Sequence, residues 1–231
     1  METNFPPVFV INLEDRKDRW NEIQQSFKEW PVTLERIDAV RASPGWKGCI
    51  KSHKKAVEHA KNNSYPWVLV LEDDSIPANG KASFTQFTQL LPYLWETRDS
   101  WELFSGGPTI LFDYTVHNTQ PLLFDVKSYG AHFMLINEKA YSKIINSPEN
   151  EPIDVFYKKS MNCLCTLPHI AYQKEGKSDI ENTEVNYTNH FTKSSSELTK
   201  KLNKHLNGYR VEFFLGTAIV LSLLLLKVTA K

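Results

Sequence analysis

Hydrophobic residues in the first part of the chain occur as short apolar runs. Val8–Leu13 and Trp67–Leu71 are both of strand length and rich in Val and Leu. Such runs are typical of strands that are buried on both faces of a sheet. Between them, Val32–Val40 alternates apolar and polar residues, which favours a further strand. The pattern therefore predicts three strands within the first 71 residues.

Helical spacing separates these strands. Glu14–Trp30 predicts a charged turn that leads into an amphipathic helix, which Pro31 ends. After a loop with Pro44, the segment Cys49–Lys61 again places its apolar residues at helical spacing. The order strand, helix, strand, helix, strand is typical of an α/β fold.

The later pattern predicts more elements of both kinds. We expect helices at Phe84–Leu94, Glu138–Ile145 and Asp154–Met161, and strands at Glu102–Gly106 and Ala131–Ile136. From Glu175 to Ser196 the chain is polar and rich in Asn, Thr and Ser, as a linker would be.

The chain divides into three parts on this basis. Residues 1–180 form a globular domain, 181–210 a polar linker, and 211–231 a candidate membrane anchor. Phe213–Leu226 contains no charged residue and predicts a C-terminal hydrophobic helix, either a single membrane span or a buried terminal helix. Lys200 and Lys201 precede this segment, so the positive-inside tendency predicts a membrane-associated protein with its catalytic domain in the cytosol.

Composition adds two exclusions. The 231 residues include 27 basic and 27 acidic side chains, a balance that argues against a nucleic-acid partner bound through phosphate neutralisation. The three cysteines, Cys49, Cys163 and Cys165, are too few for a disulfide framework or a four-ligand zinc site. They favour a reducing compartment, and Cys49 is most simply a small buried residue.

Three consecutive acids follow the apolar run Trp67–Leu71. Glu72, Asp73 and Asp74 cannot enter the core, so they should emerge together at the carboxyl end of the strand. Ligands bind at this edge of an open α/β sheet, and carboxylates there suit a hard cation such as Mn²⁺ or Mg²⁺. The alternative is an acidic turn with no ligand.

Four segments then occur in an order that resembles glycosyltransferase family 25, which includes lipopolysaccharide and procollagen galactosyltransferases. The segments are Val10–Leu13 with Arg16, Asp18, Arg19 and Trp20; Pro44 and Gly45 with Gly48, Cys49, Ser52 and His53; Leu69–Asp74; and Pro152 and Asp154 with Pro168, Gln173 and Ser178–Ile180. Together they cover the chain from Val8 to about Ile180.

The resemblance implies a GT-A-like nucleotide-sugar-binding domain with a central, mostly parallel sheet. It implies transfer of a hexose, such as galactose, from a nucleotide diphosphate sugar with a UDP-sugar as the expected donor, and the family's products suggest inversion. A cation held by Asp73 and Asp74 would stabilise the departing diphosphate, which also gives Asp74 a catalytic role.

Further residues become candidate donor contacts. These are Asn12, Arg16, Arg19, Asp38, Ser52, His53 and Glu72. Structural alternatives exist for several of them: a solvated helix start for the two arginines, a turn for Asp38, and a hydrogen-bonding role for His53.

An inverting reaction needs a base for the acceptor hydroxyl. Asp154, at the start of a predicted helix, is the first candidate, and its alternative is a helix cap. Glu102 and Asp113 are rivals, and His169 and Asp179 are candidates for an additional metal or donor contact.

The sequence thus predicts a metal-dependent glycosyltransferase that acts on a glycan or glycoprotein acceptor and is held at a membrane by its C-terminal segment. One alternative is a catalytically inactive protein of the same fold that binds a nucleotide sugar or glycan. Another is a membrane-anchored adaptor that uses the α/β domain as an interaction surface.

Overall fold

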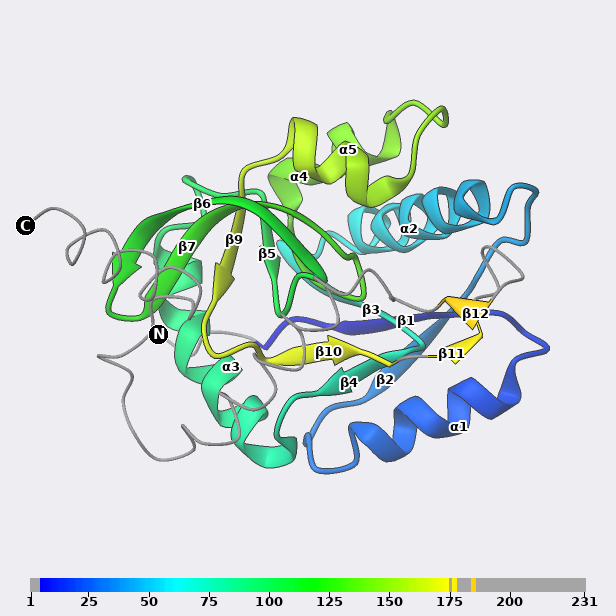
Figure 1. Cartoon of the computed structure of the whole chain (residues 1–231), viewed down its shortest axis with the longest axis horizontal. Coiled ribbons are helices and arrows are strands. Elements are labelled where there is room, and N and C mark those ends of the chain that lie inside the picture. The colour runs from blue at the N-terminus through cyan, green and yellow to red at the C-terminus, as the bar shows by residue number, and fades with distance from the viewer. Residues whose placement is uncertain (1–4, 175, 178–183, 186–231) are drawn as a thin grey trace, which may run out of the picture.

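An eight-stranded sheet forms the centre of the molecule, in the order β2-β1-β3-β8-β5-β9-β7-β6 (Figure 1). The structure is a computed structural model that describes residues 5–174, 176–177 and 184–185. Strands β8 and β7 are antiparallel to both of their neighbours, and every other neighbouring pair is parallel. Six of the eight strands therefore run in one direction, which confirms a mostly parallel α/β sheet.

The strands of this sheet are short. They span Val8–Asn12 (β1), Leu34–Asp38 (β2), Trp67–Glu72 (β3), Leu103–Ser105 (β5), Ile110–Thr119 (β6), Leu122–Tyr129 (β7), Phe133–Asn137 (β8) and Cys163–Thr166 (β9). Two small antiparallel pairs are separate from it: β4 (Ser75–Pro77) with β10 (Ala171–Gln173), and β11 (Gly176–Lys177) with β12 (Glu184–Val185).

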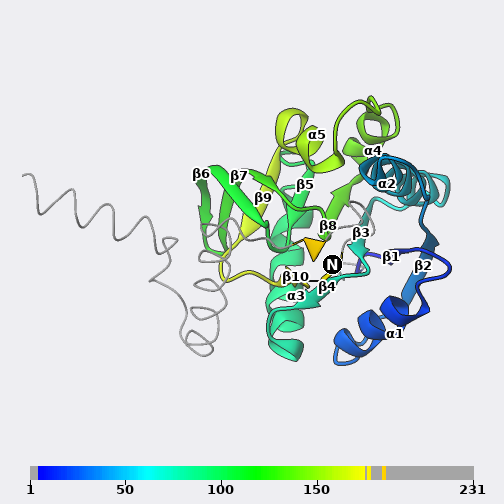
Figure 2. The ribbon, with the colours of Figure 1, turned by 45° about the vertical axis from the view of Figure 1, so that its right-hand side comes forward.

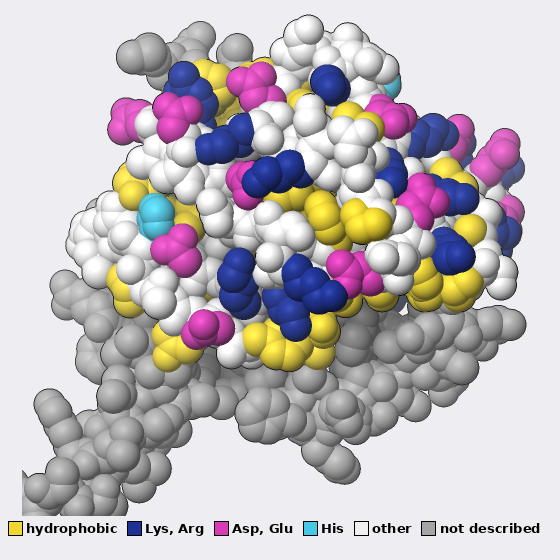
Figure 3. Space-filling model, turned by 90° about the horizontal axis from the view of Figure 1, so that it is seen from above, with side chains coloured by type: hydrophobic (Ala, Val, Ile, Leu, Met, Phe, Trp, Pro, Cys, Tyr) yellow, Lys and Arg dark blue, Asp and Glu magenta, His cyan; other side chains and the backbone are white. Residues whose placement is uncertain are grey.

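Helices cover both faces of the sheet (Figure 2). Their bounds are Lys17–Ser26 (α1), Gly45–Asn62 (α2), Gly80–Glu96 (α3), Glu138–Ile145 (α4) and Ile153–Ser160 (α5). Helices α2, α4 and α5 pack on one face, and α1 and α3 pack on the other. The outer surface above α4 and α5 carries basic and acidic side chains in interspersed groups (Figure 3).

Strand β3 divides its side chains between these two layers. Val68 and Val70 join the core beneath α2, whereas Leu69 and Leu71 join the core that contains α1 and α3. All four are 0% exposed. This alternation follows from the two-residue period of a strand, and it continues into the acids that come next.

Most predicted elements are present. The predicted helix Glu138–Ile145 has the observed bounds of α4, and helix Cys49–Lys61 begins four residues earlier, at Gly45. The hairpin of β6 and β7 was not predicted. Strand β6 is an edge strand with exposed apolar side chains at Leu111, Phe112 and Val116, and two register shifts interrupt its pairing with β7.

The predicted membrane anchor requires a correction. None of the helices in the described part of the chain has the length and apolarity that a bilayer crossing needs. The segment 211–231, on which the prediction was based, lies outside the described residues, as does the predicted linker 181–210 apart from β12. The predicted single-pass anchor and the localisation derived from it are therefore withdrawn.

The close approach of α2 to the chain after β2 gives a test of this packing. A Cβ atom added at Gly48 would lie 2.3 Å from the Val40 carbonyl oxygen. Gly48→Ala should therefore lower the free energy of unfolding by about 1–3 kcal/mol, although alanine is the better helix former. Urea unfolding measures the change, and Lys51→Ala, at an exposed position of α2, is the control. An unchanged or higher stability for Gly48→Ala would contradict this packing.

Candidate functional site

The carboxyl ends of β1 and β3 lie next to each other and bring Asn12 and the three predicted acids to one edge of the sheet. The acids do not point in one direction. Glu72 lies on the side of α2, where it contacts Cys49 and His53, and Asp73 lies on the side of α1, where it contacts Arg19. The strand period therefore separates Glu72 from Asp73, two neighbouring carboxylates that were predicted to emerge together.

Asp73 is held by two donors. Arg19 donates from Nη1 to its Oδ1 at 2.9 Å, and the buried Asn12 donates from Nδ2 to its Oδ2 at 2.8 Å. Burial raises the pKa of Asp73, and these donors oppose that change. Both carboxylate oxygens are thus engaged, so a metal ion at Asp73 would compete with Arg19.

Asp74 has a different environment. Its Oδ2 accepts a hydrogen bond of 3.1 Å from Gln173 on β10, but its Oδ1 is buried and has no hydrogen-bond partner among the described residues. Burial, and then the negative charge of Glu72, raise the pKa of Asp74 to about 7. Arg19 approaches it at 3.8 Å. A buried carboxylate oxygen without a hydrogen-bond partner lowers the stability of the folded protein, and a bound cation would stabilise it.

A cavity opens beside these two aspartates. Its volume is about 320 Å³, which is within the range of small-molecule sites. It lies between α1 and β4 and is lined by Asn21, Glu22, Ile23, Gln25, Ser26, Asp73, Asp74, Ser75, Ile76 and Lys174. The predicted acids Asp73 and Asp74 therefore face a cavity, with the Lys174 cation on its wall.

Glu72 belongs to a second group of side chains beneath α2. Its Oε1 lies 3.2 Å from His53 Nε2 and 3.5 Å from Cys49 Sγ, and the other ring nitrogen of His53 lies 3.2 Å from the Tyr157 hydroxyl. Burial raises the pKa of Glu72, but the hydrogen bond and charge of His53, the charge of His132 and the hydrogen bond from Cys49 together more than offset this, so the pKa is lowered. Burial and the charge of Glu72 raise the pKa of Cys49.

Asp154 lies at the start of α5, close to this second group. It is half-buried, and its Oδ1 accepts a hydrogen bond from the Val155 N–H, but it is the second residue of α5 and the N-cap is Pro152, so the alternative role of helix cap is wrong. Burial, and then the charge of Glu72, raise its pKa. The fold thus brings Asp154 near an acid that precedes it by 82 residues.

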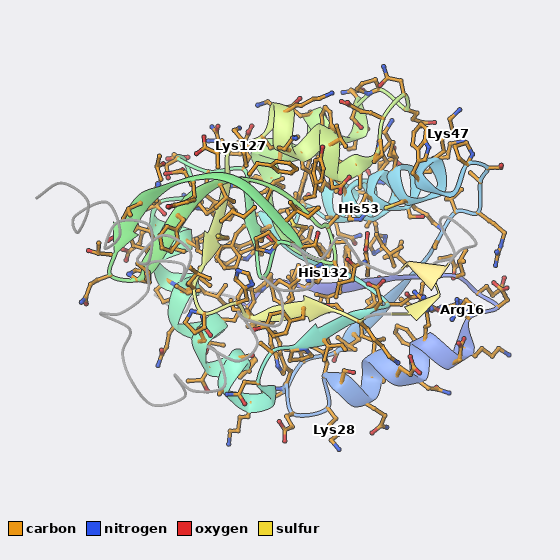
Figure 4. The ribbon with its side chains drawn as sticks, in the orientation of Figure 1. Arg16, Lys28, Lys47, His53, Lys127 and His132 are labelled. Atoms are coloured by element: carbon orange, nitrogen blue, oxygen red, sulfur yellow. The ribbon has the colours of Figure 1, made fainter. Side chains whose placement is uncertain are left out.

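His132 is a buried residue of the site that sequence reasoning missed. Its carbonyl accepts the Glu72 N–H, its side chain is 1% exposed, and neither ring nitrogen has a hydrogen-bond partner within the described residues. Burial lowers its pKa to about 4, and burial together with the charge of His132 does the same for His169. His53, on α2, and His132 both lie toward the middle of the molecule (Figure 4). The sequence signal for His132 was its position as an isolated polar residue at the start of the predicted apolar strand Ala131–Ile136.

The remaining predicted donor residues have structural partners. Ser52 accepts from the Val40 N–H and donates to the Gly48 carbonyl, which joins α2 to the chain after β2. Asp38 is exposed and pairs with Arg36, and Arg16 pairs with Asp18 at the start of α1. Asp38 is the last residue of β2, so it does not lie in the turn that was its structural alternative. The donor-binding roles of Ser52, Asp38 and Arg16 stay predictions.

Of the rivals to Asp154, Glu102 is buried against Lys143 and the Asn162 N–H, and Asp113 is exposed on β6. Neither has a described contact with the site. Asp179 lies outside the described residues.

Comparison with known proteins gives distant likenesses alone. No protein-family model and no curated protein sequence matches the chain. Among solved structures, the A197 protein from STIV has a TM-score of 0.45 at 12% identity, covering 73% of this chain and 85% of that one.

Two further solved structures are named for sugar-nucleotide enzymes. A provisionally named glucose-1-phosphate thymidylyltransferase from Bacillus anthracis has a TM-score of 0.40 at 11% identity, covering 90% of this chain and 78% of that one. A nucleoside-diphosphate-sugar pyrophosphorylase from Vibrio cholerae RC9 has a TM-score of 0.31 at 11% identity, with coverage of 71% and 72%. At these TM-scores none carries an argument about activity, and the resemblance to glycosyltransferase family 25 stays a prediction.

The buried His132 predicts a pH dependence of stability. Its pKa falls from 6.5 to about 4 on folding, so the unfolded state binds more protons between these values. Burial of the neutral ring contributes to the free energy of unfolding. This contribution, up to about 3 kcal/mol, is fully present above pH 6.5 and is lost as the pH falls through 4. In metal-free protein, His132→Leu should flatten this loss in urea unfolding between pH 7 and 4.

The partly exposed His59 offers the control, since His59→Gln should keep the acid sensitivity of the parent protein. A His132→Leu variant with the same pH profile as the parent would show that His132 is not buried in its neutral form.

Proposed function

We propose that this protein is a glycosyltransferase that binds a nucleotide diphosphate sugar in the cavity between α1 and β4 and transfers its hexose. The observation that carries the proposal is the position of Asp73 and Asp74, which directly follow the buried strand β3 and line a cavity of about 320 Å³. The ordered motifs that resemble glycosyltransferase family 25 support it, because Asn12, Arg19 and both aspartates belong to them and lie in mutual contact.

A divalent cation fits Asp74 better than Asp73. The unpartnered Oδ1 of Asp74 is the oxygen that a hard cation such as Mn²⁺ or Mg²⁺ would take, whereas both oxygens of Asp73 already accept hydrogen bonds. When bound, the cation would neutralise the diphosphate and favour its departure. Asp73 would join as a second ligand if its ion pair with Arg19 opened.

Basic residues near the cavity suit the same ligand. Lys174 lines the cavity and pairs with the exposed Glu22 at 2.8 Å, so its cation can exchange that surface partner for a phosphate at small cost. The guanidinium of Arg19 lies at the aspartates, where it can hold Asp73 in position or contact the diphosphate.

Asp154 is proposed as the base that takes the proton from the acceptor hydroxyl. A carboxyl group whose pKa is raised by burial and by a neighbouring carboxylate is the type of group that serves as a base near neutral pH. The acceptor is proposed to be a glycan or glycoprotein, in keeping with the family resemblance.

The engagement of Asp73 by Arg19 and Asn12 favours a second candidate function. If that ion pair never opens and Asp74 alone does not hold the cation, the fold would bind a nucleotide sugar without transferring it. A protein of this kind would show stabilisation by the donor but no release of nucleoside diphosphate.

Asp74→Asn tests the donor site. UDP-sugars are screened with and without Mn²⁺. The correct donor should raise the thermal unfolding midpoint of the parent protein by several degrees. Asp74→Asn should lose the Mn²⁺-dependent part of this shift and lower the release of UDP at least about 100-fold, because the cation loses its main ligand. Unchanged Mn²⁺-dependent turnover would refute the role of Asp74.

Asp99→Asn is the matched control, since it makes the same change of charge at an exposed position after α3. It should behave as the parent protein does. Stabilisation of the parent protein by a UDP-sugar without any UDP release would instead support the binding protein.

Asp154→Asn separates donor binding from transfer. The variant should keep the donor-dependent thermal shift, because Asp154 is not among the residues that line the cavity. Transfer to a panel of glycan acceptors should fall about 100-fold or more, as expected when a general base is removed. Full transfer activity would assign the base to another residue.

A further inference from the structure

Three side chains that suit a softer metal ion lie together on the other face of the sheet. Cys49 and His53 are one turn apart on α2, so they share a face of the helix, and Glu72 reaches them from the end of β3. One ligand atom from each residue lies within 4.8 Å of the other two. Within the described residues, this is the one such group of three found.

The separations match a first coordination shell. Glu72 Oε1 lies 3.2 Å from His53 Nε2 and 3.5 Å from Cys49 Sγ. Tetrahedral Zn²⁺ with bonds of about 2.0–2.3 Å places neighbouring N and O ligands about 3.3 Å apart and S and O ligands about 3.5 Å apart. The third separation, between the ligand atoms of Cys49 and His53, is within 4.8 Å, so a modest side-chain movement would place all three around one ion.

We propose that Cys49, His53 and Glu72 bind a thiophilic divalent cation, with Zn²⁺ as the best fit, at a site distinct from the hard-cation site at Asp74. A thiolate and a carboxylate supply two negative charges that balance the ion, and the imidazole is neutral. Sulfur and nitrogen ligands select Zn²⁺ over Mg²⁺ and Ca²⁺. The site does not depend on the proposed transferase activity.

A further residue orients the histidine. His53 is 0% exposed, and its Nδ1 lies 3.2 Å from the hydroxyl of the buried Tyr157. With the metal on Nε2, the ring carries its proton on Nδ1 and donates it to this hydroxyl. Such a partner on the second nitrogen is the usual arrangement for a metal-bound histidine.

The helix that carries two of the ligands is itself fixed. Ser52, between Cys49 and His53, bonds to the Val40 N–H at 2.8 Å and to the Gly48 carbonyl at 2.7 Å. Gly48 allows the closest approach of α2 to that chain. The ligand positions are therefore set before the ion binds, which reduces the ordering cost of binding.

Three protein ligands leave a fourth position for water or an arriving ligand. Asp154 lies beside the group, close enough for its charge to act on Cys49. The metal would thus lie near the residue proposed as the base, although its binding can be measured without any reaction.

Cobalt spectroscopy tests the site directly. The full-length protein is stripped with a chelator, desalted and titrated with Co²⁺, which reports a thiolate ligand as a near-ultraviolet charge-transfer band and tetrahedral geometry as visible bands. One equivalent should bind with both signatures, and one equivalent of Zn²⁺ should remove them. Absence of a thiolate band in the parent protein would overturn the proposal.

Variants assign the ligands. Cys49→Ser should lose the charge-transfer band, Glu72→Gln should weaken Co²⁺ binding more than tenfold, and Tyr157→Phe should weaken it about 10–100-fold as an orienting partner would. Cys163→Ser, which removes a buried thiol on β9, should keep the band. A band that survives in Cys49→Ser or disappears in Cys163→Ser would overturn the assignment.

Two measurements keep this site separate from the donor site. Circular dichroism of Cys49→Ser and Glu72→Gln distinguishes a lost ligand from a lost fold, and Glu72→Gln remains a test if Cys49→Ser does not fold. Asp74→Asn should lose the Mn²⁺-dependent donor shift but keep the Co²⁺ spectrum. Loss of the Co²⁺ spectrum in folded Asp74→Asn would show that there is one shared cation site and would overturn the proposal.

Discussion

The burial of β3 on both faces is the constraint on which the rest of the site depends. A strand whose side chains enter two separate cores cannot carry charge until it leaves them, so its first carboxylates appear together at its end. They are still largely shielded from water there, and each must find a partner. Asp73 is bound by Arg19 and Asn12, and Asp74 is bound by Gln173. Glu72 contacts His53 and Cys49.

The same constraint gives the two faces of the sheet different chemistry. On the side of α1, the partners are an arginine, amides and a nearby lysine, which suits a phosphate ligand and a hard cation. On the side of α2, they are a thiol, an imidazole and a phenol, which suits a softer ion. Glu72 at the end of β3 and Asp73 directly after it would therefore serve the two proposed sites, because successive side chains turn to opposite sides of the sheet.

Local pattern predicted the first half of the fold well because that half is built from local signals. Apolar runs and helical spacing gave β1, α1, β2, α2 and β3, and the acids were placed correctly at the end of β3. The hairpin of β6 and β7 was missed because β6 exposes most of its side chains, so it lacks the apolar periodicity of a buried strand. The opposite directions of Glu72 and Asp73 follow from the strand period.

The partners of the acids could not be predicted, since they come from distant segments. Gln173 reaches Asp74 because β10 pairs with β4, and Tyr157 reaches His53 across 104 residues. His132 is buried by the pairing of β8 with β3, a long-range contact that no local pattern records. The sequence therefore predicted where the acids lie and some of the residues near them. Their hydrogen-bond partners and the shifts of their pKa values depend on tertiary structure.

Strand β6 lies at one edge of the sheet in the described part of the chain, which bears on the behaviour of the protein in concentrated solution. Its backbone groups could pair with a strand of a neighbouring molecule. The exposed side chains of Leu111, Phe112 and Val116 would stabilise such pairing by hydrophobic contact. The irregularities between Leu111 and Asp113 and between Val116 and Asn118 break the row of backbone groups into short pieces. These irregularities thus protect the protein against aggregation, and regularising β6 would remove that protection.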